Sequence, residues 1–374
     1  MSAKHAVRRL VDRAALLAGV VGALERKRRD GLTVLMYHRV LPRERCRDLP
    51  FPTLVMPADA FEDEVRWLVE HRTVLPLGEA LTRLDAGRGS ERPLVVLTFD
   101  DGYGDNHAVA APILARHGAR ATFYVTTGFV ESGGLLWFDR AALALAAAGP
   151  DALERLATRA RSVAERSAAR ALAPDERSAV APDARAGAGV WPDARTGAGA
   201  CPDARAGAGV WIEWMKRVPR AERLVCLDAL DGGAPPARAA EFAPMTRAEV
   251  EALARAGHEV GSHTVDHELL PELDDAELER QLSESRATLE RWTGAPVRAF
   301  CYPNGDHDER SARAVRAAGY AHACTTGPAL HCRGDDPLRV GRTDVTTVRV
   351  CGADGRHHAA SFRAELSGFH ELLR

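Results

Sequence analysis

The sequence contains no CxxC pair, and its seven cysteines form no dense framework. A disulfide scaffold and a cysteine zinc site are therefore not indicated, because the thiols stand alone at positions 46, 201, 226, 301, 324, 332 and 351. The chain also lacks an excess of charge of either sign. Its net charge is −2, which does not favour nucleic acid as a partner. The 374 residues are 46% hydrophobic, as in an ordinary globular protein, and suffice for one large barrel or two domains.

Long hydrophobic runs are missing as well. The apolar run Ala14 to Leu24 is too short to span a bilayer. Basic residues flank it on both sides, and no small-residue cleavage site follows, which disfavours a cleaved signal peptide. We predict that residues 1–30 form a basic amphipathic helix. It either lies on an anionic membrane surface or a partner, or packs on its own domain; an uncleaved signal-like segment is a third interpretation.

A buried strand that ends in two carboxylates is the most informative stretch. Leu94 to Phe99 is apolar and β-branched, and Asp100, Asp101 and Gly102 follow it directly. Adjacent ionised carboxylates repel each other, so a cation or a proton between them would explain the pair. The alternative is an ordinary Asp-Gly turn at the end of a strand. This stretch alone leaves both interpretations open.

Strand patterns alternate with helical patterns along most of the chain, which predicts parallel βα units closed like a barrel of about seven strands. Capping boxes begin helices at Asp59–Glu62 and Thr246–Glu249, and Asp274 caps a third. Residues 339–350 are expected to be extended. The expected strands are 32–40, 73–75, 94–99, 121–126, 258–263, 297–302 and 320–325.

A long insertion interrupts this alternation. Residues 182–211 repeat ten residues three times, as in Pro182 to Trp191, and are rich in glycine, alanine and proline. Such a composition cannot bury enough apolar surface to offset ordering, so we interpret the repeats as a flexible linker. The expected domains are a helix at 1–30, a barrel in two parts at 31–140 and 241–350, the helical and low-complexity insertion at 141–240, and a tail helix at 351–374.

Two histidines form the second candidate site. His263 and His267 are four residues apart and follow a short strand and a Gly-Ser turn, so they can bind one metal ion on a helix or turn. Histidines at this spacing also occur on solvated helices. Here they lie at the end of a strand, as Asp100 and Asp101 do. Two imidazoles and one carboxylate would leave a coordination position for water, and the second aspartate would be free to act as a base.

These residues resemble the motifs of a known enzyme family. Thr98 to Gly102, His263 to His267, and Phe300 to Gly305 look like three motifs of the polysaccharide deacetylases, the NodB-homology group or carbohydrate esterase family four. The motifs stand in family order within residues 31–140 and 240–350. Tyr37 to Val40 resembles the opening strand of a bacterial branch that includes exopolysaccharide deacetylases.

The resemblance implies a distorted (β/α) barrel that hydrolyses N-acetyl groups on a glycan, such as an exopolysaccharide, peptidoglycan or a chitin-like polymer. It also implies a divalent metal, most often Zn²⁺, with Co²⁺, Ni²⁺ or Mn²⁺ as alternatives. Asp101, His263 and His267 would be the metal ligands, Asp100 the general base, and the backbone N–H of Asn304 an oxyanion donor. Tyr103, Tyr302 and Arg342 are the expected substrate-binding residues.

This sequence departs from the family at two points. Cys301 stands where many members have an arginine that orients the catalytic base, and Arg342 is a candidate replacement. The late Leu-x-His motif that supplies the general acid is not recognisable. His38 is our preferred substitute, with His307, His322 and His331 as alternatives; His38 could equally be a hydrogen-bonded residue of the barrel rim.

Two other functions stay open. The chain could be a deacylase of another acyl amide or of an O-acetyl sugar, or a non-catalytic glycan-binding module. A pure binder has no need of a free carboxylate beside three metal ligands, which counts against the module. We expect a monomer without a nucleic-acid partner, located in a bacterial cell envelope or at a membrane, on either face.

Overall fold

Two compact units make up the computed structural model, which describes residues 3–46, 49–87, 92–171, 202–233, 236–352 and 355–373. The larger unit consists of Met1–Gly133 and Pro244–Arg374, and the smaller unit of Gly134–Ala243. The larger unit holds every residue of the three motifs.

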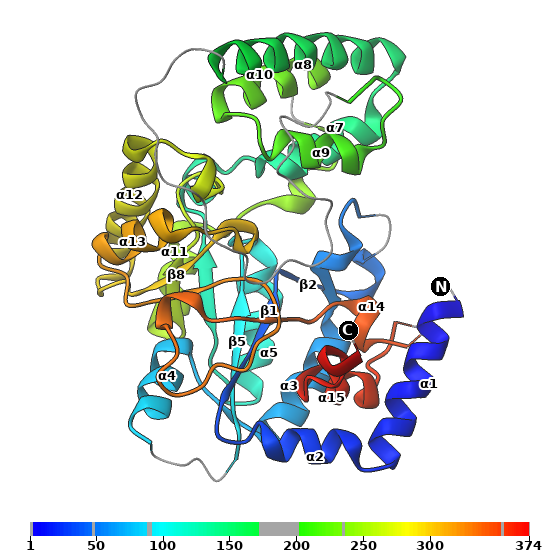
Figure 1. The fold of residues 1–374 in the computed structure, drawn as a ribbon, viewed down its shortest axis with the longest axis vertical. Helices are drawn as coiled ribbons and strands as arrows, with labels where there is room; N and C mark the ends of the chain where they lie inside the picture. The colour runs from blue at the N-terminus through cyan, green and yellow to red at the C-terminus, as the bar shows by residue number, and fades with distance from the viewer. Residues whose placement is uncertain are drawn as a thin grey trace. The chain divides into compact units, whose positions relative to one another are not determined.

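The larger unit is built on a parallel sheet (Figure 1) in which β4 pairs with β5 and the other strands follow the order β10-β1-β5-β6-β7-β8-β9. Each pairing in this sheet is parallel. Two further strands, β2 and β3, pair separately with each other. The strands are β1 (Leu32–Tyr37), β2 (Arg39–Leu41), β3 (Val55–Pro57), β4 (Thr73–Val74), β5 (Leu94–Phe99), β6 (Thr122–Val125), β7 (Glu259–Ser262), β8 (Ala299–Cys301), β9 (His322–Cys324) and β10 (Thr343–Asp344).

One segment joins the two ends of this sheet into a barrel. The N–H of Val340 donates to the carbonyl of Ala323 at 2.9 Å, beside β9. Only three residues later, Thr343 in β10 pairs with Leu35 in β1. The predicted fold, a distorted (β/α) barrel of about seven strands, is therefore confirmed.

The strands are buried on both faces, which explains their uninterrupted apolar sequences. In β1, Leu32 and Val34 belong to a core cluster inside the barrel, whereas Leu35 and Tyr37 belong to a cluster between the strands and the helices. The same alternation in β5 places Leu94 and Val96 inside. Because side chains alternate along a strand, Asp100 continues the inward-facing set of β5.

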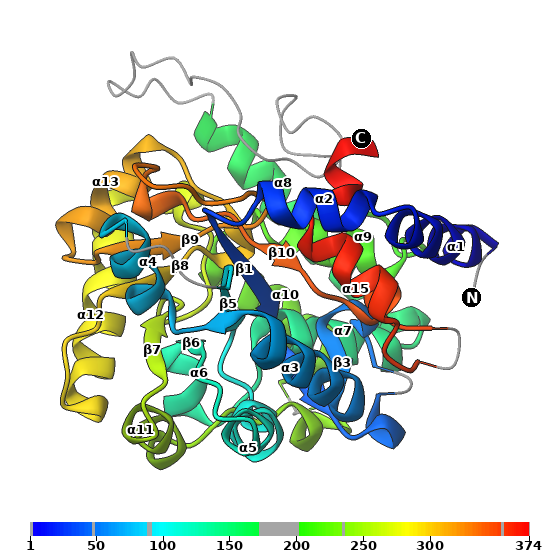
Figure 2. The same ribbon diagram turned by 90° about the horizontal axis from the view of Figure 1, so that it is seen from below.

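Helices surround the strands, as Figure 2 shows for α3, α5, α11 and α12. Thr246 and Glu249 form the predicted capping box of α11, and Asp274 caps α12 by accepting the N–H of Glu277. The helices of this unit are α1 (Ala3–Leu17), α2 (Val20–Lys27), α3 (Ala58–His71), α4 (Leu77–Asp85), α5 (Ala111–Arg116), α6 (Thr127–Ser132), α11 (Arg247–Arg255), α12 (Asp275–Thr293), α13 (Glu309–Ala317), α14 (Thr347–Val350) and α15 (Ala359–Leu366).

Three sequence-based expectations about helices were wrong. Asp59 does not cap α3, because that helix begins at Ala58 and Asp59 lies within its first turn. Residues 339–350 are not extended throughout, since α14 occupies their end. The N-terminal segment forms two helices, because Gly19 adopts a φ of 77° that ends the first helix.

The N-terminal helices pack on their own domain. Ala15 of α1 and Val21 of α2 form a small core cluster with Ala364 of α15 and Phe369 of the following 3₁₀ turn η8 (Phe369–Leu373). Among the described residues, no helix is both long and apolar enough to cross a membrane. The inner side of these helices is thus packed on their own domain.

The smaller unit consists of helices, and its bounds include the whole of the predicted insertion at 141–240. It contains α7 (Trp137–Ala147), α8 (Pro150–Ala171), α9 (Ala208–Met215) and α10 (Arg220–Asp231). The first two copies of the ten-residue repeat lie outside the described residues. The third copy does not behave as a linker, because it runs into α9 and buries Trp211 completely.

Candidate functional site

The turn after β5 separates the two adjacent carboxylates. Asp101 adopts a φ of 77° and Gly102 a φ of 93°, both in the left-handed region. This turn is fixed by hydrogen bonds from Asp100 N to Tyr37 O at 3.1 Å and from Thr126 N to Asp101 O at 3.2 Å. Both carboxylates are almost completely buried. The backbone therefore directs two neighbouring acids to different partners.

Asp101 faces the two predicted histidines. Its Oδ1 lies 3.5 Å from His263 Nε2 and 3.3 Å from His267 Nε2. The three ligand atoms lie within 4.8 Å of one another. The two rings are nearly perpendicular, with an interplanar angle of 81°. The structure therefore brings Asp101, His263 and His267 together as a cluster of potential metal ligands.

The histidines come from a loop rather than a helix. Thr264 and His267 adopt positive φ values of 67° and 56°, so the chain turns sharply after β7. His263 Nδ1 lies 2.8 Å from Cys301 O, a contact that fixes the ring and directs Nε2 at Asp101. Left-handed backbone is uncommon for residues other than glycine, and it persists only where surrounding contacts enforce it.

Gln281 of α12 supplies those contacts. Its side-chain oxygen accepts the N–H groups of Val265 at 2.9 Å and Asp266 at 3.0 Å. Its amide nitrogen donates to Asp266 Oδ2 at 2.9 Å. On the other side, Gly128 approaches so closely that an added Cβ would lie 2.7 Å from Val265 O. Sequence reasoning missed Gln281; the one available signal was a polar residue on the apolar side of the helix, beside Leu282.

Arg342 binds the other carboxylate with two parallel hydrogen bonds. Its Nη1 donates to Asp100 Oδ1 and its Nη2 to Asp100 Oδ2, each at 2.7 Å. The guanidinium also donates to Thr325 O at 2.9 Å, to Thr98 Oγ1 at 3.1 Å and to Cys301 Sγ at 3.1 Å. A fork of this kind fixes a carboxylate in orientation as well as in charge.

The position of Arg342 follows from the segment that closes the barrel. Val340 belongs to the cluster inside the barrel, and Arg342 lies two residues later. Cys301 belongs to the same inner cluster. The arginine thus reaches Asp100 from a segment next to β10, while the small thiol of Cys301 lies beside the guanidinium.

Burial and Arg342 act in opposite directions on Asp100. Burial alone would raise the pKa of this carboxyl, but the charge and the hydrogen bonds of Arg342 hold the pKa below its usual range. Asp101 is buried as well, and its pKa is also low, because His263 and His267 outweigh the effect of burial. Burial raises the pKa of the Cys301 thiol well above its usual range. The site therefore presents two carboxylates and a neutral thiol.

His38 lies beside Asp100, but the other candidate acids are spread widely. His38 Nε2 is 4.0 Å from Asp100 Oδ2, and the side chain is 16% exposed. His322 begins β9 and pairs with Glu259, the first residue of β7, so it lies at the wrong end of the strands. His331 bonds to the backbone of Leu32 at the start of β1. Both histidines therefore lie away from Asp100, at the opposite end of the strands. His307 stacks on Tyr302, with ring centroids 5.0 Å apart.

The remaining predicted residues differ in exposure. Asn304 is exposed in the turn after β8, with a φ of 58°. The neighbouring Gly305 is required sterically, because an added Cβ would lie 2.1 Å from Thr326 Oγ1. Tyr103 and Tyr302 are both fully buried, so they have packing roles here and their contact with substrate stays a prediction.

The ligand cluster fits a divalent cation. Asp101 Oδ1 is buried and has no hydrogen-bond donor within the described part of the chain. Two imidazole nitrogens lie near this oxygen instead of a conventional donor. A buried carboxylate oxygen in this state is costly unless a cation binds it, and a nitrogen and oxygen ligand set suits zinc and similar metals.

Known proteins resemble this chain in sequence and in fold. The sequence model of the polysaccharide deacetylase family matches residues 87–173 and 237–323. YxkH of Bacillus subtilis strain 168, which is named for the polysaccharide deacetylases, is 32% identical over 96 residues. That alignment covers 25% of this chain and 31% of the relative, so the chain spans under a third of the curated relative that it matches.

A solved structure shows the same fold. The deacetylase PplD of Streptococcus pyogenes, determined in complex with acetate, superimposes with a TM-score of 0.51 at 16% sequence identity. The superposition covers 84% of this chain and 92% of PplD. This structure supports the fold, and the match to the family model confirms the resemblance noted in the sequence motifs.

Proposed function

We propose that this chain is a member of the polysaccharide deacetylase family and a metal-dependent hydrolase that removes N-acetyl groups from a polysaccharide. One observation carries the proposal. Three potential metal ligands converge beside a fourth group, Asp100, which is buried and held in one orientation. A binding module gains nothing from this fourth group, whereas hydrolysis requires a base.

Asp101, His263 and His267 would hold the metal ion, for which Zn²⁺ is our first candidate. Bound there, a divalent cation supplies Lewis acidity, which lowers the pKa of water and polarises an acyl carbonyl. The protein fixes the ligands in advance. Cys301 O orients His263, and Gln281 holds the loop that carries His267.

Asp100 is the proposed general base. It accepts the proton of the water that attacks the acetyl carbonyl. Arg342 keeps this carboxylate ionised and fixes the direction of its oxygens. Arg342 is therefore a positioning residue in this proposal, and it replaces the arginine expected at position 301.

Two further groups complete the proposed reaction. His38 donates a proton to the amine as it leaves, since its ring lies at the same strand ends and is partly exposed. We assign the stabilisation of the oxyanion to the backbone N–H of Asn304. The turn that carries this residue follows β8 and so lies at the same C-terminal end of the strands as Asp101. Exopolysaccharide, peptidoglycan and chitin-like polymers are the proposed substrates.

The test is acetate release by the full-length, metal-loaded protein from chitin oligomers, poly-N-acetylglucosamine and peptidoglycan. We expect Asp100→Asn to lower the rate by at least about 100-fold while the bound metal stays at the wild-type level. Asp101→Asn should instead lose the metal. Both variants need a thermal unfolding curve, so that a folding defect is not mistaken for a chemical one.

Three outcomes would redirect the assignment. Acetate release that persists undiminished in Asp100→Asn would overturn the proposed base. Release of another acyl group, or of O-linked acetate alone, would favour the alternative deacylase. Glycan binding without hydrolysis under Zn²⁺, Co²⁺, Ni²⁺ or Mn²⁺ would favour the binding module.

A further inference from the structure

The side of helix α1 that carries Arg8 and Asp12 faces the rest of the protein. Asp12 is completely buried, and its two carboxylate oxygens contact His370 Nε2 at 2.7 Å and Ser361 Oγ at 2.6 Å. One turn earlier, Arg8 forms an ion pair with Glu365 of α15. The inner side of α1 is thus held by polar contacts to α15 and η8, together with the small apolar cluster around Ala15.

The apolar residues of α1 consequently lie on its outer side. We call Val7, Leu10, Val11 and Leu17 the α1 stripe; their side chains are 60%, 70%, 41% and 78% exposed. The spacings of three, four and seven residues place them along one side of the helix. Val20, which follows at the start of α2, is 42% exposed. Several large apolar side chains exposed on one side of a helix often mark a binding surface.

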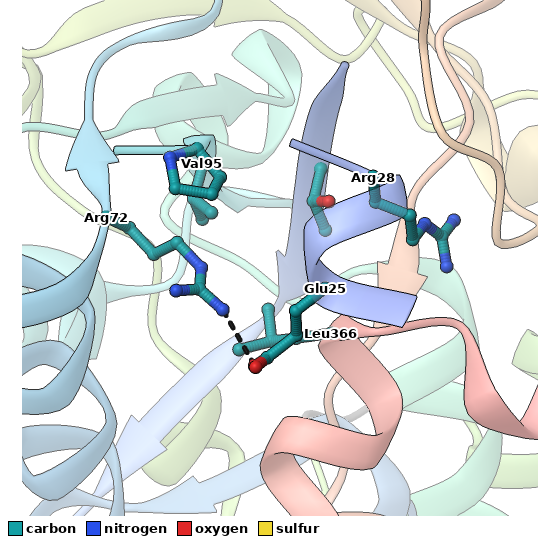
Figure 3. Close-up of a pocket in the computed structure, with 7 residues that line it drawn as sticks. Glu25, Arg28, Arg72, Val95 and Leu366 are labelled. Atoms are coloured by element: carbon teal, nitrogen blue, oxygen red, sulfur yellow. Dashed lines mark hydrogen bonds and ion pairs between the residues drawn. The ribbon is translucent and has the colours of Figure 1, made fainter. Parts of the chain in front are cut away.

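The acidic residues of this segment do not face outward with the stripe. Residues 4–29 contain eight lysines and arginines but only two acids, Asp12 and Glu25. Glu25 of α2 accepts hydrogen bonds from Arg72 at 2.8 Å, as Figure 3 shows, and from Arg363 at 2.6 Å. Both acids are therefore neutralised from within the domain.

Basic residues of the same two helices are exposed as well, namely Arg13 of α1 and Arg26 and Lys27 of α2. The exposed residues of α1 and α2 therefore include both apolar and positively charged side chains, although the chain as a whole has a net charge of −2. This combination is that of helices which lie in the interface of an anionic membrane. Figure 2 shows α1 and α2 together along one edge of the barrel unit.

We propose that the α1 stripe docks the protein on an anionic lipid bilayer, with the helix axis lying along the surface. The stripe enters the acyl boundary, and Arg13, Arg26 and Lys27 contact the lipid phosphates. A second copy of the chain fits less well, because a two-fold contact through this face would bring the same basic side chains together. This proposal does not depend on the deacetylase activity.

Vesicle sedimentation tests the proposal without any glycan. The full-length protein is mixed with vesicles of equimolar phosphatidylglycerol and phosphatidylcholine, and with vesicles of phosphatidylcholine alone. We expect the protein to bind the anionic vesicles and to be released by salt. Leu10→Glu with Leu17→Glu should reduce the partition coefficient at least about 10-fold, because two exposed leucines no longer enter the bilayer. Replacing Arg13, Arg26 and Lys27 by glutamine should reduce it on the order of 100-fold at low salt.

Val225→Glu is the matched control, because Val225 is an exposed valine of α10 in the smaller unit and is 39% exposed. This variant should partition as the wild type does, and all variants should unfold at the wild-type temperature. Equal partitioning of wild type and the Leu10→Glu, Leu17→Glu variant would overturn the proposal, as would wild-type protein that ignores both kinds of vesicle. A dimer that dissociates in this variant, without vesicle binding, would assign the stripe to a contact between copies.

Discussion

Two carboxylates, the buried Asp100 and the partly buried Glu259, lie at opposite ends of the barrel strands and differ in their surroundings. Glu259 is the first residue of β7. It accepts from Gly78 N at 3.1 Å and Thr122 Oγ1 at 2.9 Å, and lies 2.9 Å from His322 Nε2. Asp100 follows the last residue of β5 and receives two hydrogen bonds from Arg342. Both acids thus have a basic partner, His322 for Glu259 and Arg342 for Asp100.

The two ends of the barrel differ in whether the carboxylate oxygens there have hydrogen-bond donors. Around Glu259, both carboxylate oxygens have donors, and the cluster is complete in itself. Beside Asp100, Asp101 Oδ1 lacks a hydrogen-bond donor among the described residues, and two histidines face it. The contacts at the start of the strands therefore serve stability. The end of the strands holds a carboxylate oxygen without a hydrogen-bond donor among the described residues, as expected where a barrel of this kind binds its ligand.

Removing Arg342 should have the largest effect. Arg342→Met leaves Asp100 buried without its partner, and we expect the free energy of unfolding to fall by about 3–5 kcal/mol. In the protein that remains folded, kcat should fall about 100-fold with little change in KM, because the base is no longer held in place. Unfolding curves and steady-state acetate release measure the two effects.

Arg342→Lys provides the control. Lysine keeps the positive charge but cannot make two parallel contacts, so kcat should lie between the values of wild type and Arg342→Met. Metal content should stay constant in all three proteins, since Arg342 contacts none of the proposed ligands. An unchanged kcat in Arg342→Met would remove the distinction between the two ends of the barrel.

Replacing Glu259 should affect stability alone. Glu259→Gln removes the charge that faces His322, and we expect the free energy of unfolding at pH 7 to fall by about 1–3 kcal/mol. Burial would raise the pKa of Glu259, but His322 and the other donors lower it overall. Its contribution is therefore present above the ordinary glutamate pKa of about 4.3 and is lost as the pH falls further.

The measurement is urea unfolding of wild type and Glu259→Gln between pH 7 and pH 3. The difference between the two proteins should shrink on the acid side. The acetate release per folded molecule should not change. A fall in kcat with unchanged stability would contradict the assignment of this end of the barrel to structure.

The sequence allowed the end of the strands to be recognised because its residues are local. Asp100 and Asp101 directly follow a buried strand, His263 directly follows another, and parallel strands bring their ends to one side. Arg342 was only a candidate, because its position depends on a closing segment whose pairing with both β9 and β1 is not encoded in local periodicity. Gln281 was missed because a lone buried polar residue has no motif.

The N-terminal helix shows the same limit in another form. The helical period shows which residues of α1 share a side. It does not reveal which side is buried. Burial is decided by His370, Ser361 and Glu365, which lie more than 300 residues further along the chain and bind the charged side instead.

A third ion pair, between the partly buried His370 and the buried Asp12, depends on pH in the opposite direction. Burial alone would lower the pKa of His370, but Asp12 and Glu365 raise it to about 8. The stabilisation that protonated His370 provides is therefore fully present below about pH 6.5, the ordinary pKa of histidine. It is lost as the pH rises through about 8, the pKa of His370 in the folded protein. His370→Gln should lower the free energy of unfolding by about 1–2 kcal/mol at pH 6 and by less at pH 9. Urea unfolding at both values measures this, and an effect that grows with pH would contradict the assignment.

The finest test uses two threonines that are register partners on β5 and β6, Thr98 and Thr122. Thr98 Oγ1 accepts from Arg342, whereas Thr122 Oγ1 donates to Glu259. Thr98→Val and Thr122→Val should each lower the free energy of unfolding by about 1 kcal/mol. Only Thr98→Val should also lower kcat, by a few-fold at most, because it loosens the fork on Asp100. Equal rates in both variants would mean that Arg342 holds Asp100 without help from its own neighbours, and the chemical end of the barrel would then consist of the ligands, the base and Arg342 alone.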